Sequence, residues 1–319
     1  MARALVASVG ILFPGQGSQT VGMGADLFES RPDLLGDSAD EILGFSLRRL
    51  CLDGPEEELT RTEHAQPALF ALSYALWEMV ESENGLRPDG AAGHSLGEYT
   101  ALTSAGVFEF EAGLGLVASR GRAMAHAAAD AESGMAALLG ADRQSAEEVC
   151  QARRHEGGSL WVANVNAPGQ IVVAGGRDDL AWLAEHAPEM GFRRVIPLKV
   201  AGAFHSPFMA TARAELATAL EATQISEPGF PVWSNTTARP HGSDELEELL
   251  ARQLVEPVLF SDSLQDMAAA GVDTFIHVGP GDVTAGLARK AVEGAEVHTI
   301  SAVADIRPVL DVVGTMDRH

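Results

Sequence analysis

The chain carries the pentapeptide GHSLG at residues 93–97, which fits the pattern G-x-S-x-G. In this pattern a serine, here Ser95, occupies a strained turn between a strand and a helix, with its hydroxyl projecting beside an oxyanion pocket. Small residues are needed on both sides because neighbouring backbone passes too close for a side chain. The flanks agree, since residues 89–92 can end a buried strand and residues 96–105 read as the start of a helix. We therefore expect a nucleophilic serine on an α/β framework.

Composition indicates an ordinary globular protein. Its 319 residues can bury a full core, with 46% hydrophobic and 21% charged residues, values typical of globular domains. No apolar run approaches the roughly 18–20 residues that span a bilayer, and we interpret the apolar N-terminal stretch as a first buried strand rather than a signal peptide. Cys51 and Cys150 lack motif spacing and fit reduced thiols. We expect a cytoplasmic protein, by default a monomer.

The chain is strongly acidic, with 22 Lys and Arg against 45 Asp and Glu and a net charge of −23. This charge argues against nucleic acids and anionic membranes as partners. An acidic protein partner would need a local basic patch. Four basic pairs are candidates, although each also fits solvated surface charge: Arg120 with Arg122, Arg153 with Arg154, Arg193 with Arg194, and Arg289 with Lys290.

Apolar periodicity and turn residues predict two subdomains. Within residues 131–198 the expected order is β-α-β-β-α-β, which is typical of a ferredoxin-like unit. Its elements are strands at 135–139, 160–165, 170–174 and 193–199 and helices at 145–153 and 178–190. Residues 1–130 and 199–319 are expected to form a hydrolase-like α/β subdomain with a parallel sheet. Its predicted elements are strands at 5–14, 230–234 and 274–278, and helices at 21–30, 34–50, 66–82, 110–129, 243–255, 260–270 and 282–292.

A serine nucleophile needs a base. Among the ten histidines, His205 in the segment GAFHSP is the best candidate, because it stands where the large subdomain is expected to resume. No Asp occupies an obvious partner motif, so the hydrolase order of Ser, acid and His is not evident.

A second unusual segment, FPGQGSQ at residues 13–19, places Gln16 between two glycines. Backbone there can approach a ligand, although the segment also fits a plain turn after a strand. As a dinucleotide fingerprint it fails, because Thr20 stands where the third Gly belongs. A P-loop and zinc-spaced Cys and His are also missing from the sequence.

Six motifs occur in a fixed order: FPGQGSQ, GHSLGEYTAL, NVNAPGQIVVAGG, GAFHSPFM, QLVEPV and VGPGDVTAGL. Together they resemble malonyl-CoA:acyl carrier protein transacylases and the related acyltransferases of polyketide synthases, over nearly the whole chain. The resemblance implies ping-pong transfer of a malonyl group from malonyl-CoA, through acyl-Ser95, to the phosphopantetheine thiol of an acidic acyl carrier protein. It implies no metal and no redox cofactor.

The resemblance also implies the catalytic residues. Ser95 would be the acylated nucleophile, and His205 the general base and then the acid for the leaving thiolate. Gln253 matches the position whose backbone carbonyl orients the histidine in this family, which would explain the missing Asp. The backbone N–H groups of Leu96 and Gln16 would form the oxyanion hole.

The implied substrate contacts centre on Arg120, which matches the family arginine that grips the free malonyl carboxylate. A guanidinium pairs bidentately with a carboxylate, whereas Arg122 fits a surface helix position. Phe204 resembles the phenylalanine of the H-A-F-H pattern, with Gly202 in place of the first His, and would crowd a 2-methyl branch. One methyl is worth only ~1–3 kcal/mol, so discrimination should be incomplete.

The remaining implied lining residues each have a plain structural alternative. His94 and Asn166 would line the site, although Asn166 equally fits a turn. Met124 and Val283 match apolar lining positions that ordinary core packing also explains. His277, which precedes V-G-P-G, has no assigned role.

Two other functions remain open. A serine hydrolase that releases acyl groups from carrier proteins would use the same Ser95 and His205 but admit water, and Arg120 disfavours it. A non-catalytic carrier-binding protein is disfavoured because Ser95, His205, Gln16 and Arg120 are all intact. The resemblance does not separate fatty acid from polyketide synthesis.

Overall fold

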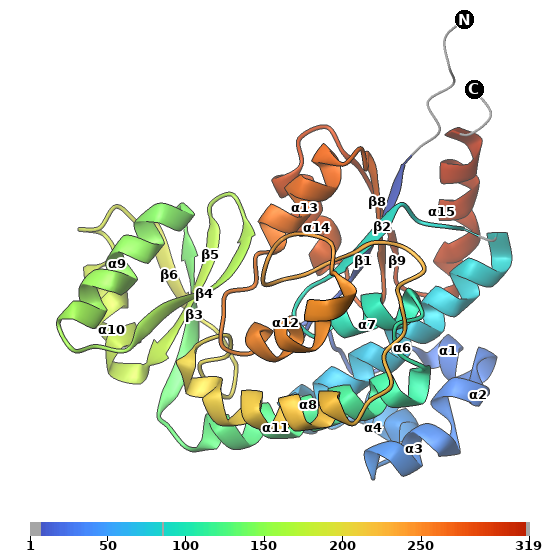
Figure 1. Cartoon of the computed structure of the whole chain (residues 1–319), viewed down its shortest axis with the longest axis horizontal. Helices are drawn as coiled ribbons and strands as arrows, with labels where there is room; N and C mark the ends of the chain where they lie inside the picture. The colour runs from blue at the N-terminus through green and yellow to red at the C-terminus, as the bar shows by residue number, and fades with distance from the viewer. Residues whose placement is uncertain (1–7, 85, 317–319) are drawn as a thin grey trace, which may run out of the picture.

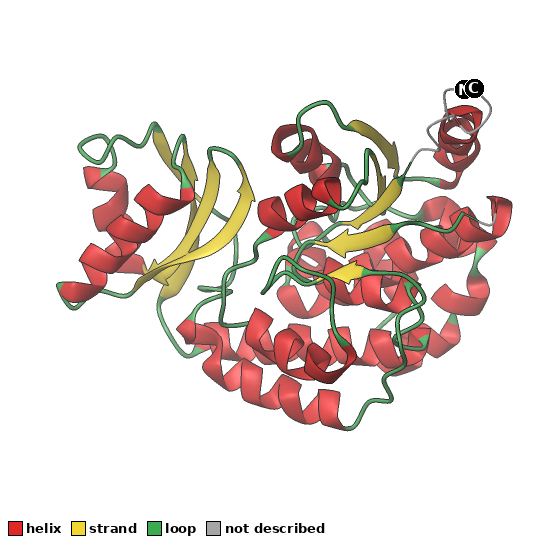
Figure 2. Ribbon diagram, turned by 45° about the horizontal axis from the view of Figure 1, so that its top comes forward, coloured by secondary structure: helices red, strands yellow, loops and turns green. Residues whose placement is uncertain are grey.

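The computed structural model of the chain describes residues 8–84 and 86–316. Its strands form two separate sheets, of five and four strands, drawn in yellow in Figure 2. In Figure 1 the four-stranded sheet and its two helices lie at one side, and the five-stranded sheet lies among the remaining helices. The molecule thus has a large α/β subdomain and a small one.

The five-stranded sheet has the order β7-β2-β1-β8-β9, and every pair in it is parallel. Strands β1, β2 and β8 are buried along their whole length, as expected where helices cover both faces of a parallel sheet. Three predicted strands correspond to β1, β7 and β8, although residues 5–7 of the first lie outside the described residues. The strands are β1 (Val9–Phe13), β2 (Gly90–Gly93), β7 (Val232–Trp233), β8 (Thr274–Val278) and β9 (Glu296–Ile300).

Helices surround this sheet, and α8 and α11 run side by side below it in Figure 1. Within the described residues, no helix combines the length and apolar character needed to cross a membrane. The helices are α1 (Ala25–Ser30), α2 (Pro32–Leu35), α3 (Asp37–Leu43), α4 (Leu47–Asp53), α5 (Glu56–Thr60), α6 (Thr62–Asn84), α7 (Gly97–Ser104), α8 (Phe110–Ala129), α11 (Ala210–Glu221), α12 (Leu246–Gln253), α13 (Phe260–Ala269), α14 (Val283–Ala291) and α15 (Val303–Met316), with short 3-10 turns η1 (Pro207–Met209) and η2 (Ser243–Glu245).

The single helix predicted over 34–50 is wrong, because the structure has parts of α2, α3 and α4 there. Gly44 ends α3 in the left-handed conformation, with φ 77°, and such a residue stops a helix while satisfying its last carbonyls. The sequence also did not reveal α5, α11, α15 and β9. In α11 the buried residues are Ala212, Leu216 and Leu220, within an alanine-rich run. Alanines on its other faces weaken the apolar periodicity by which an amphipathic helix is predicted.

The small subdomain confirms the predicted β-α-β-β-α-β order. Its antiparallel sheet has the order β4-β5-β3-β6, that of a ferredoxin-like unit, and it has a hydrophobic cluster of its own. The elements are β3 (Ser133–Leu139), α9 (Arg143–His155), β4 (Leu160–Ala167), β5 (Gln170–Gly176), α10 (Arg177–His186) and β6 (Arg194–Pro197). They fall inside residues 131–198, whose boundaries as a separate unit stay a prediction.

The parallel strands bring four loops to one edge of the large sheet. Phe13 at the end of β1 is level with Gly93 at the end of β2, and β7 and β8 run in the same direction. The carboxyl ends of parallel strands are where ligands bind in open α/β sheets. The small subdomain is joined to the large one near this edge, since Val165 N–H donates to the carbonyl of Val258 (2.9 Å).

Candidate active site

Ser95 occupies the sharp turn between β2 and α7, in the left-handed region with φ 54°. A non-glycine residue there costs ~1–2 kcal/mol, and the turn leaves no room beside it. A Cβ on Gly93 would lie 1.8 Å from the carbonyl carbon of Gly97. One on Gly97 would lie 2.5 Å from the carbonyl oxygen of Phe13. Both glycines of the G-x-S-x-G pattern are therefore required by close backbone approach.

His205 is hydrogen-bonded to the serine. Its Nε2 lies 2.8 Å from Ser95 Oγ, and its Nδ1 lies 2.7 Å from the backbone carbonyl oxygen of Gln253. A carbonyl only accepts, so Nδ1 carries the proton and Nε2 presents its lone pair to the serine hydroxyl. Burial, and then the nearby charge of Arg120, lowers the pKa of His205 to about 3. The imidazole is thus neutral and ready to accept a proton from Ser95.

Arg120 projects from α8 and is fully buried. Its Nη1 donates to Gln66 Oε1 (2.6 Å), and its Nη2 donates to Gln253 Oε1 (2.8 Å) and Ser95 Oγ (3.0 Å). Its Nε has no partner among the described residues, and the guanidinium carbon lies 5.4 Å from the ring centre of Tyr99. Burial lowers the pKa of Arg120. The hydrogen-bond partners that the described residues give this buried cation are all neutral, and the Glu98 carboxylate acts on its pKa without a hydrogen bond to it.

A cavity of about 260 Å³ opens in front of these groups. Ten of the eleven predicted site residues line it, and Gln253 lies behind Ser95 and Arg120 instead. The lining residues that sequence reasoning singled out are Gln16, His94, Ser95, Leu96, Arg120, Met124, Asn166, Phe204, His205 and Val283.

The backbone at Gln16 lies against the serine turn. A Cβ on the preceding residue, Gly15, would lie 2.5 Å from the carbonyl oxygen of His94. The N–H groups of Gln16 and Leu96 have no acceptor among the described residues, and both residues line the cavity. Two free N–H groups beside a nucleophile are the requirement for an oxyanion hole.

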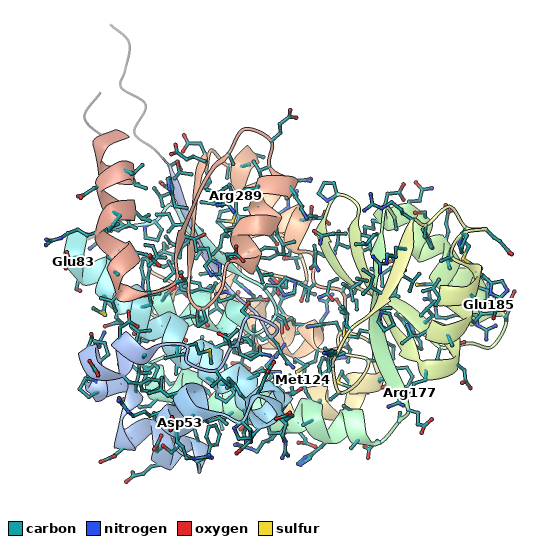
Figure 3. The ribbon with its side chains drawn as sticks, turned by 180° about the vertical axis from the view of Figure 1, so that it is seen from behind. Asp53, Glu83, Met124, Arg177, Glu185 and Arg289 are labelled. Atoms are coloured by element: carbon teal, nitrogen blue, oxygen red, sulfur yellow. The ribbon has the colours of Figure 1, made fainter. Side chains whose placement is uncertain are left out.

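Residues from both subdomains meet at the cavity. His94 Nε2 donates to Asn166 Oδ1 (2.7 Å), so Asn166 contributes more than a turn. Burial lowers the pKa of His94. Val283 has 46% of its surface exposed, so it is not a core residue, and the alternative of ordinary core packing does not hold for it. Met124 is buried, accepts a hydrogen bond from Gln66 Nε2 (3.4 Å) and lies close to the junction of the subdomains in Figure 3.

Sequence reasoning missed three polar residues that surround Ser95 and Arg120. Asn235 follows β7 and accepts from Ser95 N–H through Oδ1 (2.7 Å). Gln66 holds Arg120, and Glu98 lies just beyond the serine turn. The predicted strand at 230–234 carried a signal for Asn235, because residues that directly follow parallel strands gather at the same edge.

His277 is part of the support of the site. It is the last but one residue of β8 and is fully buried, with Nδ1 2.5 Å from Thr284 Oγ1 and Nε2 3.0 Å from the carbonyl oxygen of Gly279. Burial lowers its pKa to about 4. The neutral ring thus joins the end of β8 to the start of α14, which carries Val283.

No group of three or more His, Cys, Asp or Glu side chains within the described residues is arranged to hold a metal ion. The expectation of a reaction without metal or redox cofactor stays a prediction.

Comparison with known proteins agrees with this site. Residues 11–319 match the family model of the acyl transferase domain. The chain is 42% identical over 288 residues to the malonyl CoA-acyl carrier protein transacylase of Bacillus subtilis, covering 89% of this chain and 90% of that protein. It is 40% identical over 289 residues to a polyketide biosynthesis malonyl CoA-acyl carrier protein transacylase of the same organism, covering 89% and 97%.

Solved structures show the same fold. A malonyl-CoA:acyl carrier protein transacylase from Xanthomonas oryzae matches with a TM-score of 0.90 at 37% identity, covering 98% of this chain and 99% of that one. A malonyl-transacylase solved with its type II polyketide synthase carrier protein matches with a TM-score of 0.91 at 33% identity, covering 96% and 100%. The fold and the serine site therefore define an acyltransferase. The chain belongs to the acyl transferase family, and the relatives named above are malonyl transacylases.

Proposed function

We propose that this chain transfers a malonyl group from malonyl-CoA to the phosphopantetheine thiol of an acyl carrier protein, through an acyl-Ser95 intermediate. The environment of Arg120 is the main support: a buried guanidinium whose hydrogen-bond partners are neutral, which lies 3.0 Å from the serine oxygen at the wall of the cavity. A buried cation is costly without an anion. The free carboxylate of a malonyl group, with its thioester carbon at Ser95, supplies that anion.

In the first half-reaction Ser95 Oγ attacks the thioester carbon, and its proton passes to His205 Nε2. The tetrahedral oxyanion accepts hydrogen bonds from the N–H groups of Leu96 and Gln16, and donors so aimed typically contribute about 10²–10³ in rate. The C–S bond then breaks, and the CoA thiolate takes the proton back from His205 Nε2. The carbonyl of Gln253 holds the imidazole in the tautomer that this step needs.

In the second half-reaction the carrier thiol is the nucleophile and Ser95 is the leaving group. The phosphopantetheine thiol gives its proton to His205 Nε2 and attacks the malonyl ester carbon. The ester C–O bond breaks, and Ser95 Oγ recovers its proton from the imidazolium. Throughout both steps Arg120 holds the malonyl carboxylate, so the acyl carbon stays beside the oxyanion donors.

The carrier protein would approach the mouth of the cavity. Lys199 is exposed and lines the cavity, and Lys290 Nζ donates to Gln170 Oε1 (3.1 Å), which also lines it. Arg153 and Arg154 instead make contacts within the small subdomain. Arg153 pairs with Asp179, and Arg154 donates to the carbonyl of Leu160. The two lysines therefore form our candidate basic patch for an acidic carrier.

We place the protein in a reducing compartment, the cytoplasm. Both cysteines are buried free thiols. Burial raises the pKa of Cys51 and of Cys150 to about 12, which keeps both protonated and slow to oxidise.

The test is intact-protein mass spectrometry after brief mixing with malonyl-CoA, acetyl-CoA or methylmalonyl-CoA. The wild type should gain a malonyl adduct, Ser95→Ala should gain none, and Arg120→Ala should lose malonyl loading or switch to acetyl. Holo-carrier protein added afterwards should discharge the adduct. CoA release without an adduct would instead indicate a hydrolase, and no adduct and no turnover would refute the proposal.

A further inference from the structure

Glu98 is a buried carboxylate that the proposed mechanism does not use. It lies in the first turn of α7, three residues after Ser95, and none of its surface is exposed. A buried carboxylate is unfavourable unless hydrogen bonds satisfy it. Three donors do so: His241 Nε2 at 2.6 Å, Gln253 Nε2 at 2.6 Å and the backbone N–H of Asn235 at 3.1 Å. Segments far apart in the sequence therefore converge on this one side chain.

The first consequence concerns the amide of Gln253, which lies between Glu98 and Arg120. A carboxylate only accepts hydrogen bonds and a guanidinium only donates them. Nε2 of Gln253 must therefore face Glu98, and Oε1 must face Arg120 Nη2, 2.8 Å away. In the reversed orientation the amide NH2 would face the guanidinium N–H of Arg120, and the amide oxygen would face the carboxylate of Glu98. Both contacts are repulsive. Glu98 thus determines which end of Gln253 holds the guanidinium.

The second consequence concerns the strained serine turn. Gln253 Nε2 also donates to the carbonyl oxygen of Ser95 (2.9 Å), and Asn235 Oδ1 accepts from its N–H (2.7 Å). Asn235 Nδ2 donates to the carbonyl of Gly93 (2.7 Å). Both residues that clamp the left-handed Ser95 are themselves bound to Glu98.

His241 completes the arrangement from the far side of Glu98. Its side chain is 1% exposed, and its Nε2 must carry a proton to donate to the carboxylate. Its Nδ1 has no partner among the described residues. The contact with Glu98 is thus the hydrogen bond by which this buried ring is held, and it leaves Oε2 of Glu98 to Gln253 and Asn235.

We propose that Glu98, held by His241, is a positioning residue for acyl transfer. It acts through Gln253 on the guanidinium of Arg120, and through Gln253 and Asn235 on Ser95, without touching the acyl group. The inference rests on the proposed function, in which Arg120 binds the malonyl carboxylate. Loss of Glu98 should therefore weaken the preference for malonyl over acetyl groups as well as the rate.

The decisive variant is Glu98→Leu, because it offers no acceptor to His241, Gln253 or Asn235. Glu98→Gln would not decide, since the His241 ring can move its proton to the unpartnered Nδ1 and accept from an amide NH2. His241→Leu removes one donor and leaves Glu98 in place, whereas His241→Gln keeps a donor near Nε2. Asp179→Asn is the matched control: that carboxylate is also buried and accepts from Arg153 and from Ser159 N–H, but within the small subdomain.

The measurement is the second-order rate constant of Ser95 acylation by malonyl-CoA and by acetyl-CoA, with thermal unfolding as the test of folding. Glu98→Leu should lower the malonyl constant about 10- to 100-fold and the acetyl constant less, so that their ratio falls. His241→Leu should shift the ratio the same way, and His241→Gln should recover most of it. Asp179→Asn should lower the unfolding temperature and leave the ratio unchanged.

A folded Glu98→Leu protein with the wild-type ratio would overturn the inference, as would an equal loss for both substrates. If that variant fails to fold, the ratio of His241→Leu decides by the same criterion. A wild type that gains no malonyl adduct at Ser95 refutes the proposed function instead, so the two failures are distinguishable.

Discussion

Nδ1 of His205 lies 2.7 Å from the backbone carbonyl oxygen of Gln253, the position at which a Ser–His–Asp triad places its carboxylate. The carbonyl sets the tautomer of the ring as an Asp would, but it adds no negative charge. Arg120 Nη2 lies 3.0 Å from Ser95 Oγ, and its positive charge lowers the pKa of His205. The imidazolium is therefore less stable than in a triad, so His205 should stay neutral at a lower pH.

We expect malonyl loading by the free protein to show no acidic limb near the ordinary imidazole pKa of about 6.5. Burial and Arg120 lower the pKa of His205 to about 3, so the base stays neutral well below neutral pH. Quenched mixing followed by mass spectrometry, over about pH 5 to 8, measures this. In Arg120→Gln the positive charge is gone, so the pKa of His205 should rise, and the acidic limb of acetyl loading by this variant should move toward neutral. A half-maximal loading rate at pH ~6.5 in the wild type would contradict this assignment.

Phe204 should limit the acceptance of branched acyl groups. Its ring lines the cavity beside His205 and is 5% exposed. Phe204→Leu should raise methylmalonyl loading relative to malonyl loading by about tenfold, because one methyl is worth ~1–3 kcal/mol. Competition between equal amounts of the two CoA esters, read as the ratio of adducts, measures this. Phe108→Leu, at a buried position away from the cavity, is the control. An unchanged ratio in Phe204→Leu would remove Phe204 from the specificity site.

His277 should make folding stability depend on pH. Its pKa is about 4 in the folded protein and is lowered by burial, against about 6.5 unfolded. Between these two pKa values the unfolded chain therefore binds more protons than the folded chain. The stability that neutral His277 contributes is complete above about pH 6.5 and is lost as pH falls toward about 4, at roughly 1.4 kcal/mol per pKa unit.

The measurement for His277 is the unfolding temperature as a function of pH. His277→Gln should lower it at neutral pH and make its decline toward acidic pH shallower. His205, whose pKa is also lowered, leaves a residual slope. His155→Gln, at an exposed position, is the matched control. An identical slope in His277→Gln and wild type would refute this role.

Lys199 and Lys290 should govern carrier binding but not acyl loading. Charge reversal at both, Lys199→Glu with Lys290→Glu, should raise the KM for the carrier protein about tenfold or more, because it places like charges opposite an acidic partner. Malonyl loading from malonyl-CoA should be unchanged. Reversal of Arg153 and Arg154, whose side chains are engaged within the small subdomain, is the matched control. A greater effect from that pair would move the docking surface to α9.

Several features of this protein were predictable from local sequence because local physics determines them. The G-x-S-x-G turn demands small residues within five positions, and the small subdomain follows from alternating patterns and turn residues. The short helices between residues 32 and 53 were not separated, because the apolar pattern continues past Gly36 and Gly44 and only the folded backbone shows that helices end there.

The candidate site likewise contains residues that the sequence indicated and residues that only the fold revealed. The six ordered motifs contain Ser95 and His205, and the family resemblance that they carry implied Arg120. The structure brings both His205 and Arg120 within hydrogen-bond distance of Ser95. Asn235 had only its place directly after a predicted strand as a signal. His241 carried no local pattern, because its importance comes only from what lies beside it.

By itself, the sequence determined the nucleophile turn and the order of elements in the small subdomain, because both depend on neighbours along the chain. The family resemblance of its motifs supplied most of the candidate site residues. Only the tertiary structure decided that Glu98 lies behind Gln253 and that Arg120 has neutral partners. Parallel strands bring the ends of distant segments to one sheet edge, and burial there makes every unpaired donor or acceptor costly. Which donor meets which acceptor is therefore a property of the folded chain.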